Sequence, residues 1–181
     1  TFGGKYINTP ETPVFKKSQV LYGLNYSRAR IAKEHRAIIV EGQIDCLRLI
    51  QLGFNIAVAG QGTAFGEGQV RELIRLGVRE VFLAFDGDHA GEEAAAKVGD
   101  LFQREGVEVR FVALPEGQDP DSLLRAQGVQ GLLDLLKSST DYLEFLVSHY
   151  SKTYPLDKPS GKNALVQTIA GQIREWPSGI M

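Results

Sequence analysis

Six acidic residues share one feature: each follows shortly after the end of an apolar segment. They are Glu41, Asp45, Asp86, Asp88, Asp119 and Asp121. Only Gly87 separates Asp86 from Asp88, and this i, i+2 spacing puts both carboxylates on one side of an extended chain. Gathered carboxylates repel one another unless a cation lies among them, and Mg²⁺ prefers oxygen ligands of this kind. Two such ions would hold the attacking and leaving oxygens of a phosphoryl transfer.

Other metal chemistry has little support in the residue types. The three histidines, His35, His89 and His149, show no ligand spacing, and Cys46 is the only cysteine. A zinc or iron site needs a cluster of such nitrogen and sulfur ligands, so the residues favour hard divalent ions alone.

Each acid also has a structural interpretation, which stays open at this point. Asp119 precedes Pro120 and is typical of a helix N-cap, while Asp121 and Asp45 are typical first-turn acids that favour the helix dipole. A structural role explains Asp86 and Asp88 least well, because two acids directly after a wholly apolar strand have no packing purpose. The same holds for Glu41.

The elements that must position these acids alternate along the chain. Apolar runs predict strands at 37–40, 55–59, 81–85 and 107–114. Helical spacing of apolar residues, followed by glycine, predicts helices at 44–52, 67–76 and 90–105. This alternation predicts an α/β fold with a mostly parallel sheet and helices on both faces. Ligands of such sheets bind outside the carboxyl ends of the strands, which is where the acids fall.

The pattern changes after Pro115, where no strand signal recurs. Helices are expected at 120–127, 129–137, 141–152 and 160–176. Thr140 is the expected N-cap of the helix at 141–152. We therefore expect three parts: a basic N-terminal remnant at 1–36, the α/β domain at 37–138, and the start of a small all-α subdomain at 139–181.

The net charge of −2 combines two opposed parts. Residues 1–40 hold seven Lys and Arg against two Glu, a net charge of +5, and the other 141 residues hold 13 basic and 20 acidic residues, a net charge of −7. A basic segment next to a cluster of acids is compatible with phosphate chemistry despite the acidic total. The single cysteine indicates a reducing, cytoplasmic location. The lack of an initiator Met suggests a piece of a longer chain.

Two sequence segments resemble the toprim domain, which primases, topoisomerases and some nucleases share. They are Val-Glu-Gly-Gln-Ile-Asp at 40–45 and Ala-Phe-Asp-Gly-Asp-His-Ala-Gly at 84–91. Residues 5–17, residues 62–64 with Gln69, and residues 114–121 are similar to segments of bacterial DnaG-type primases. The resemblance covers roughly residues 5–150.

This resemblance implies the RNA-polymerase core of a primase, which copies single-stranded DNA into an RNA primer from ribonucleoside triphosphates. It implies that Glu41, Asp86 and Asp88 are the central catalytic acids, and that Asp45, Asp119 and Asp121 complete a pocket for two Mg²⁺ or Mn²⁺ ions. The residues expected to border the nucleotide and the template are Lys5, Tyr6, Asn8 and Lys17.

The resemblance also implies partners and a location. Zinc is expected only in a domain absent from this chain, and the replicative helicase is expected to bind through another absent domain. A bacterial cytoplasmic location at the nucleoid and replication fork follows, with no membrane partner. Two alternatives remain: a topoisomerase or nuclease toprim, or a non-catalytic toprim module. The second predicts that some acids are replaced, whereas all six positions are acidic here.

Overall fold

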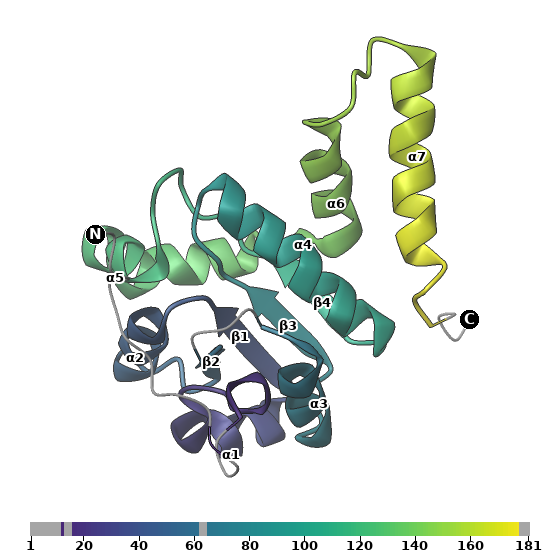
Figure 1. The fold of residues 1–181 in the computed structure, drawn as a ribbon. Coiled ribbons are helices and arrows are strands. Elements are labelled where there is room, and N and C mark those ends of the chain that lie inside the picture. Colours follow the sequence, from purple (N-terminus) through teal and green to yellow (C-terminus); the bar gives the residue numbers. More distant parts are fainter. Residues whose placement is uncertain (1–11, 13–15, 62–64, 178–181) are drawn as a thin grey trace.

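The computed structural model describes residue 12, residues 16–61 and residues 65–177, which form a sheet covered by helices on both faces (Figure 1). The strands are β1 (Arg36–Val40), β2 (Ala57–Ala59), β3 (Glu80–Leu83), β4 (Glu108–Phe111) and β5 (Thr140–Asp141). The helices are η1 (Lys17–Gln19), α1 (Leu24–Glu34), α2 (Gln43–Gln51), α3 (Glu67–Arg75), α4 (His89–Arg104), α5 (Pro120–Lys137), α6 (Tyr142–Ser151) and α7 (Pro159–Ile173). The predicted α/β fold is confirmed.

The order of the strands decides where a ligand would bind. The sheet runs β2-β1-β3-β4-β5, and β1 to β4 are parallel. The chain leaves β1 toward β2 and then crosses back to β3 on the other side of β1. Outside the carboxyl ends of β1 and β3 this reversal opens the crevice in which such sheets bind ligands.

Alternating strand residues build two cores. Ile38 and Val40 of β1 point into a core with the buried residues of α2 and α5. Ala37 and Ile39 point into the opposite core, which α1, α3, α4 and α6 cover. Strands that are apolar on both faces need helices on both sides of the sheet to bury them. This packing also positions the strand ends that the acids follow.

Some element boundaries differ from expectation. A fifth strand, β5, pairs antiparallel with β4, although no strand was expected after Pro115. It has only two residues, so it leaves no periodic signal in the sequence. Asp141 rather than Thr140 caps α6, since its side chain accepts a hydrogen bond from Leu143 N at 2.8 Å. The two helices expected on either side of Gly128 are confirmed, because this glycine interrupts α5 with φ +66°.

Helix α6 packs directly against α4. Tyr142 is completely buried, and its hydroxyl donates a hydrogen bond to the carbonyl of Ala96. A Cβ on Gly99 would lie 2.1 Å from Cε2 of the Tyr142 ring, so only glycine allows this contact. Phe145 and Leu146 enter the same core as the sheet. The domain boundary after residue 138 stays a prediction, although the packing joins α6 closely to the α/β layers.

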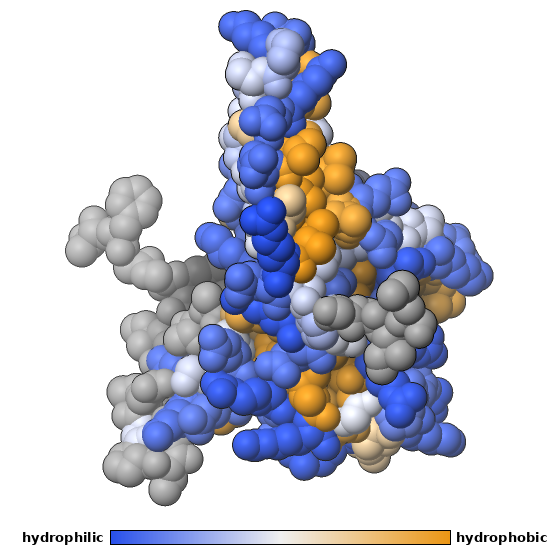
Figure 2. Space-filling model, turned by 90° about the vertical axis from the view of Figure 1, so that its right-hand side faces the viewer, coloured by the Kyte–Doolittle hydropathy of each residue, from blue (hydrophilic) through white to orange (hydrophobic). Residues whose placement is uncertain are grey.

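The outer helices leave some apolar surface exposed. Four exposed apolar side chains on α6 and α7 are Leu143, Val147, Val166 and Ile173. Figure 2, which views the molecule from the α7 side, shows apolar surface along these helices. Within the part of the chain that the structure describes, no helix is both long and apolar enough to cross a membrane.

The close contact at Gly99 generates a stability prediction. Gly99→Ala drives a methyl group into the Tyr142 ring, and we expect it to lower the free energy of unfolding by about 1–3 kcal/mol. Gly171→Ala is the matched control, because no atom lies within 4 Å of the added Cβ. Gly171→Ala should raise the free energy of unfolding by up to about 1 kcal/mol, because alanine has a higher helix propensity than glycine. Urea unfolding measures both, and equal effects would contradict the packing.

Candidate active site at the carboxyl edge of the sheet

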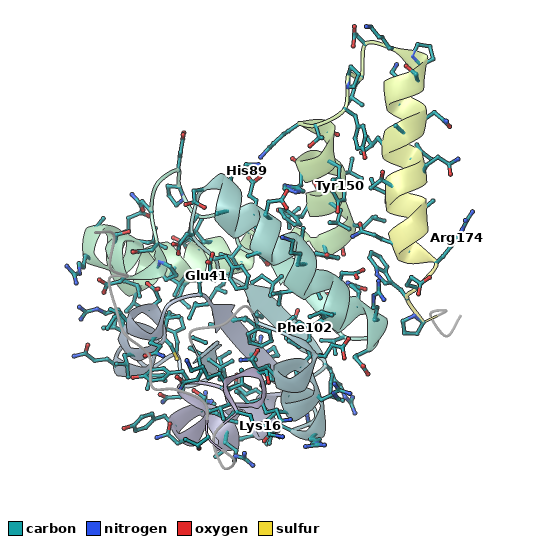
Figure 3. All side chains as sticks on the ribbon, viewed as in Figure 1. Lys16, Glu41, His89, Phe102, Tyr150 and Arg174 are labelled. Atoms are coloured by element: carbon teal, nitrogen blue, oxygen red, sulfur yellow. The ribbon has the colours of Figure 1, made fainter. Side chains whose placement is uncertain are left out.

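Glu41 and Asp86 face each other across the crevice between β1 and β3. Glu41 directly follows β1, and its Oε1 accepts a hydrogen bond from Asp86 N, three residues beyond β3, at 3.3 Å. Figure 3 shows Glu41 at this edge of the sheet, with His89 at the start of α4 above it. The two acids that sequence analysis placed on separate strand ends are therefore linked.

Glycine allows the loop after β3 to lie against the loop after β4. Gly87 N donates to the carbonyl of Gln118, and Gly117 N donates to the carbonyl of Gly87, both at 2.8 Å. A Cβ on Gly87 would lie 2.2 Å from the carbonyl oxygen of Pro115. This backbone clamp fixes the positions of the acids on either side of Gly87 without using their side chains.

Asp88 is the N-cap of α4. Its Oδ1 accepts a hydrogen bond from Gly91 N at 2.8 Å, which satisfies one of the free N–H groups of the first turn. The backbone of Gly91 also lies very close to that of Asp86, since a Cβ on Gly91 would lie 2.1 Å from the carbonyl oxygen of Asp86. The orientation of the Asp88 carboxylate is thus tied to the first turn of α4.

Asp45 is the most deeply buried acid of the group, with 7% of its surface exposed. Burial raises the pKa of Asp45 to about 6, and repulsion by Asp119, Asp86 and Asp121 adds to the rise. A hydrogen bond from Asp121 N to Asp45 Oδ1, at 3.0 Å, acts in the opposite direction. Near neutral pH, this position carries a charge that only a cation would compensate well.

The pKa values of Glu41 and Asp86 are also raised. Burial raises the pKa of Glu41, and the charge of Asp86 raises it further. The pKa of Asp86 is also raised, by burial first and then by Asp119 and Asp88. The charge of Asp86, which follows β3, therefore acts on Glu41, which follows β1, and the charge of Asp119, the N-cap of α5, acts on Asp86.

Asp121 differs from the others, because two guanidinium groups neutralise it. Arg48 of α2 donates to its Oδ1 at 2.6 Å, and Arg125 lies 2.7 Å from its Oδ2. The hydrogen bond from Arg48 holds the pKa of Asp121 below its ordinary value. Asp119 caps α5 by accepting from Ser122 N at 2.7 Å, as its structural interpretation predicted.

The structure brings the predicted acids to one edge of the sheet, where two hydrogen bonds and their charges relate them. Glu41 accepts from Asp86 N and Asp45 accepts from Asp121 N, and the charges of Asp88 and Asp119 act on Asp86, while the carboxylate of Asp121 is engaged by arginines. Nevertheless, no three His, Cys, Asp or Glu side chains among the described residues are arranged to hold a metal ion by themselves. Mg²⁺ is commonly bound by one or two carboxylates with waters and substrate phosphates completing its shell, and such sites need no larger cage.

The predicted basic residues can be followed only in part. Lys5, Tyr6 and Asn8 lie outside the described residues. Lys17 begins η1, which Gln69 of α3 holds by donating to the Lys17 carbonyl at 3.2 Å. Figure 3 shows the neighbouring Lys16 well away from Glu41. The nucleotide-contacting role of Lys17 stays a prediction.

Sequence reasoning missed two features of this edge. The first is Arg48, whose position one turn after Asp45 was the available signal. The second is a cavity of about 670 Å³ that extends from Glu41 along α4, lined by Phe65 and Phe85 among others. Its lining comes from several elements far apart in the chain, so no local pattern predicts it.

Three family models match the chain. Residues 38–124 match a model described as Toprim-like, and residues 1–28 match the N-terminal domain of the DNA primase catalytic core. Residues 143–181 match a model described as the DnaB-helicase binding domain of primase. This last match differs from the expectation that the helicase-binding domain is absent, because the matched residues include α7 and almost all of α6.

Known proteins are similar over nearly the whole chain. The DNA primase of Chlamydia pneumoniae is 55% identical over 99% of the chain, and the aligned part is 30% of that protein. A DNA primase domain from Pseudomonas aeruginosa has a TM-score of 0.87 and 35% identity, with 98% of this chain and 56% of that chain covered. A DnaG primase catalytic domain bound to single-stranded DNA has a TM-score of 0.86 and 32% identity, with 97% and 57% covered.

The matches cover nearly all of this chain but only part of the longer relatives. The chain spans less than a third of the length of the curated relatives it matches. The structures of primase catalytic domains cover 97% or more of it, so they include α6 and α7 as well as the sheet. With the toprim motifs at the strand ends and primase segments on both sides of them, the chain belongs to the family of bacterial DnaG-type DNA primases.

Proposed function

We propose that this chain forms the catalytic part of a DNA primase, which synthesises RNA primers on single-stranded DNA by metal-dependent nucleotidyl transfer. The observation that carries the proposal is the link between Glu41 and Asp86 across the β1–β3 crevice. It brings acids from two strand ends to the place where an α/β sheet binds its ligand. The family to which the chain belongs supports the same reaction.

The donor set fits a divalent metal, which toprim primases use in general. Every candidate ligand is a carboxylate, and the raised pKa values of Glu41, Asp45 and Asp86 record a charge that lacks compensation. We propose that Asp86 and Asp88, with Asp45, Asp119 and Glu41 around them, hold two Mg²⁺ or Mn²⁺ ions. The arginine partners of Asp121 suit it better to positioning Asp45 through its backbone N–H than to metal binding.

The residues of the chain then have distinct roles in the transfer. The 3′-hydroxyl oxygen of the primer attacks the α-phosphorus of a ribonucleoside triphosphate, and pyrophosphate leaves. Bound ions would supply charge neutralisation for the phosphates and acidify the hydroxyl. Glu41, whose burial favours its protonated form, is suited to accept the hydroxyl proton or to serve as a further ligand.

The substrates and partners of the whole protein are also proposals. Lys5, Tyr6, Asn8 and Lys17 are proposed to border the nucleotide and the template. Single-stranded DNA is the proposed template, and the similar DnaG catalytic domain that binds single-stranded DNA supports this choice. The match at residues 143–181 supports a helicase partner. Zinc belongs to a further domain in this proposal, and the location is the bacterial cytoplasm at the replication fork.

Removing one central acid tests the function. In a full-length protein that contains this chain, Glu41→Gln or Asp86→Ala should lower primer synthesis by more than about 100-fold, because each removes a charge opposite the reacting phosphates. Incorporation of labelled ribonucleotides on single-stranded DNA measures the loss, and the urea midpoint should not fall.

Glu144→Gln is the matched control for these variants, because Glu144 is an exposed acid on α6. It should retain full synthesis. Near-normal synthesis by Glu41→Gln or Asp86→Ala would contradict the proposal. Cleavage or relaxation of supercoiled DNA in place of primer synthesis would point to a nuclease or topoisomerase instead.

The raised pKa of Asp45 predicts a pH-dependent stability. Its folded pKa of about 6 exceeds the ordinary value of 3.8, so the folded state is favoured at low pH and loses stability as pH rises through 6. Asp45→Asn removes this penalty and keeps an oxygen for Asp121 N. The quantity to measure is the free energy of unfolding of Asp45→Asn minus that of wild type, in EDTA. This difference should be larger at pH 8 than at pH 4 by about 2–3 kcal/mol.

Asp157→Asn is the control for this measurement, because Asp157 is an exposed acid. Its free energy of unfolding relative to wild type should vary little between the two pH values. A difference for Asp45→Asn that is the same at pH 4 and pH 8 would show that burial does not disfavour the Asp45 charge.

A further inference from the structure

Helix α6 binds the first turn of α4 through a charged contact. Nζ of Lys152, directly after α6, donates to both carboxylate oxygens of Glu92, at 2.7 and 2.8 Å. Glu92 stands in the first turn of α4, the turn that Asp88 caps. The contact therefore reaches the helix end that orients a candidate metal ligand.

His149 makes a second, buried contact with the same turn. Only 5% of its surface is exposed; its Nδ1 lies 3.3 Å from Glu92 and its Nε2 lies 3.3 Å from Glu93. The Phe145 ring stacks on it at a centroid distance of 5.6 Å, so the imidazole is fixed in its place. Two successive acids of α4 are thus held by one side chain of α6.

These contacts form part of the wall of the site. A cavity of about 380 Å³ is lined by Asp86, Asp88, His89, Glu92 and Lys152, among others. The Lys152–Glu92 contact and two of the candidate ligands therefore border the same space. Figure 3 shows His89 at the start of α4, and it shows Tyr150 on α6, the helix that carries His149.

The charges explain why such a contact is needed. Four acids occur between residues 86 and 93, and like charges so close together oppose a fixed arrangement. Although burial acts against it, the hydrogen bonds from Lys152 and His149 hold the pKa of Glu92 below its ordinary value. Glu92 is thereby kept as an anion that is paired with Lys152 and His149.

We propose that Lys152 and His149 are positioning residues for the metal site: by holding Glu92 and Glu93, they fix the first turn of α4 and with it the Asp88 carboxylate. This inference rests on the proposed function, because it assumes that Asp88 takes part in metal binding. It makes α6 a part of the active-site framework, although α6 supplies no proposed ligand.

Calorimetric titration of the 181-residue chain with Mn²⁺ tests the proposal. Lys152→Met should raise the Mn²⁺ dissociation constant by about 10- to 100-fold, the range typical of groups that orient metal ligands. Lys152→Arg keeps a cation that can pair with Glu92, and should bind Mn²⁺ within about 3-fold of wild type. Rescue by arginine distinguishes positioning from a general loss of structure.

Lys162→Met is the matched control, because Lys162 is an exposed lysine on α7 and not one of the residues that hold the first turn of α4. It should bind Mn²⁺ like wild type. His149→Gln and Glu92→Gln provide independent variants, and both should weaken binding in the same direction as Lys152→Met. Urea unfolding shows that each variant is folded at the temperature of the titration.

The outcomes separate this inference from the proposed function. If wild type and Lys152→Met bind Mn²⁺ equally well, the positioning role is wrong and the metal site stands. If the folded wild-type chain gives no binding heat at all, the metal site itself is wrong, and the inference fails with it. Weaker binding by Lys152→Met and Lys152→Arg alike would also overturn the inference, because pairing with Glu92 would not be the cause.

Discussion

Repulsion among carboxylates at one edge of the sheet is the constraint to which the surrounding structure responds. Asp45 is buried and Asp86 and Asp119 are partly buried, so solvent screens their charges poorly. The fold compensates with backbone donors from Asp86, Gly91 and Ser122 N–H groups, and with cations on neighbouring helices. The compensation is incomplete for Asp45 and Glu41, and there a bound cation would add most.

Backbone contacts, more than side-chain packing, hold the reactive edge in place. Gly87 and Gly91 allow two loops and a helix start to approach within distances that any Cβ would obstruct. Because the loops are joined by their own N–H and C=O groups, this joint does not use the carboxylates of Asp86 and Asp88. Such preorganisation would serve the proposed phosphoryl transfer, since charge stabilisation is most effective when the groups need not move.

The parts of the structure that sequence predicted are those with local causes. Continuous apolar runs predicted the parallel strands, and acids at strand ends predicted that Glu41 and Asp86 lie at the same edge of the sheet. The contact of Asp121 with Arg48 could not be predicted, because the two residues are 73 positions apart and meet only through the packing of α2 against α5. The attachment of α6 depends on Gly99 and Tyr142, whose fit is a matter of three-dimensional packing. β5 is too short to produce any pattern.

The burial of Tyr142 affects how the protein can be dissected. A chain cut after residue 138 would lose Tyr142, Phe145 and Leu146, and it would expose the apolar surfaces of α4 and β4 that they cover. Contiguous apolar surface of this kind promotes aggregation. The minimal stable piece of this α/β domain therefore extends through α6. A recombinant fragment designed from the toprim sequence motifs alone would end too early to remain well behaved in solution.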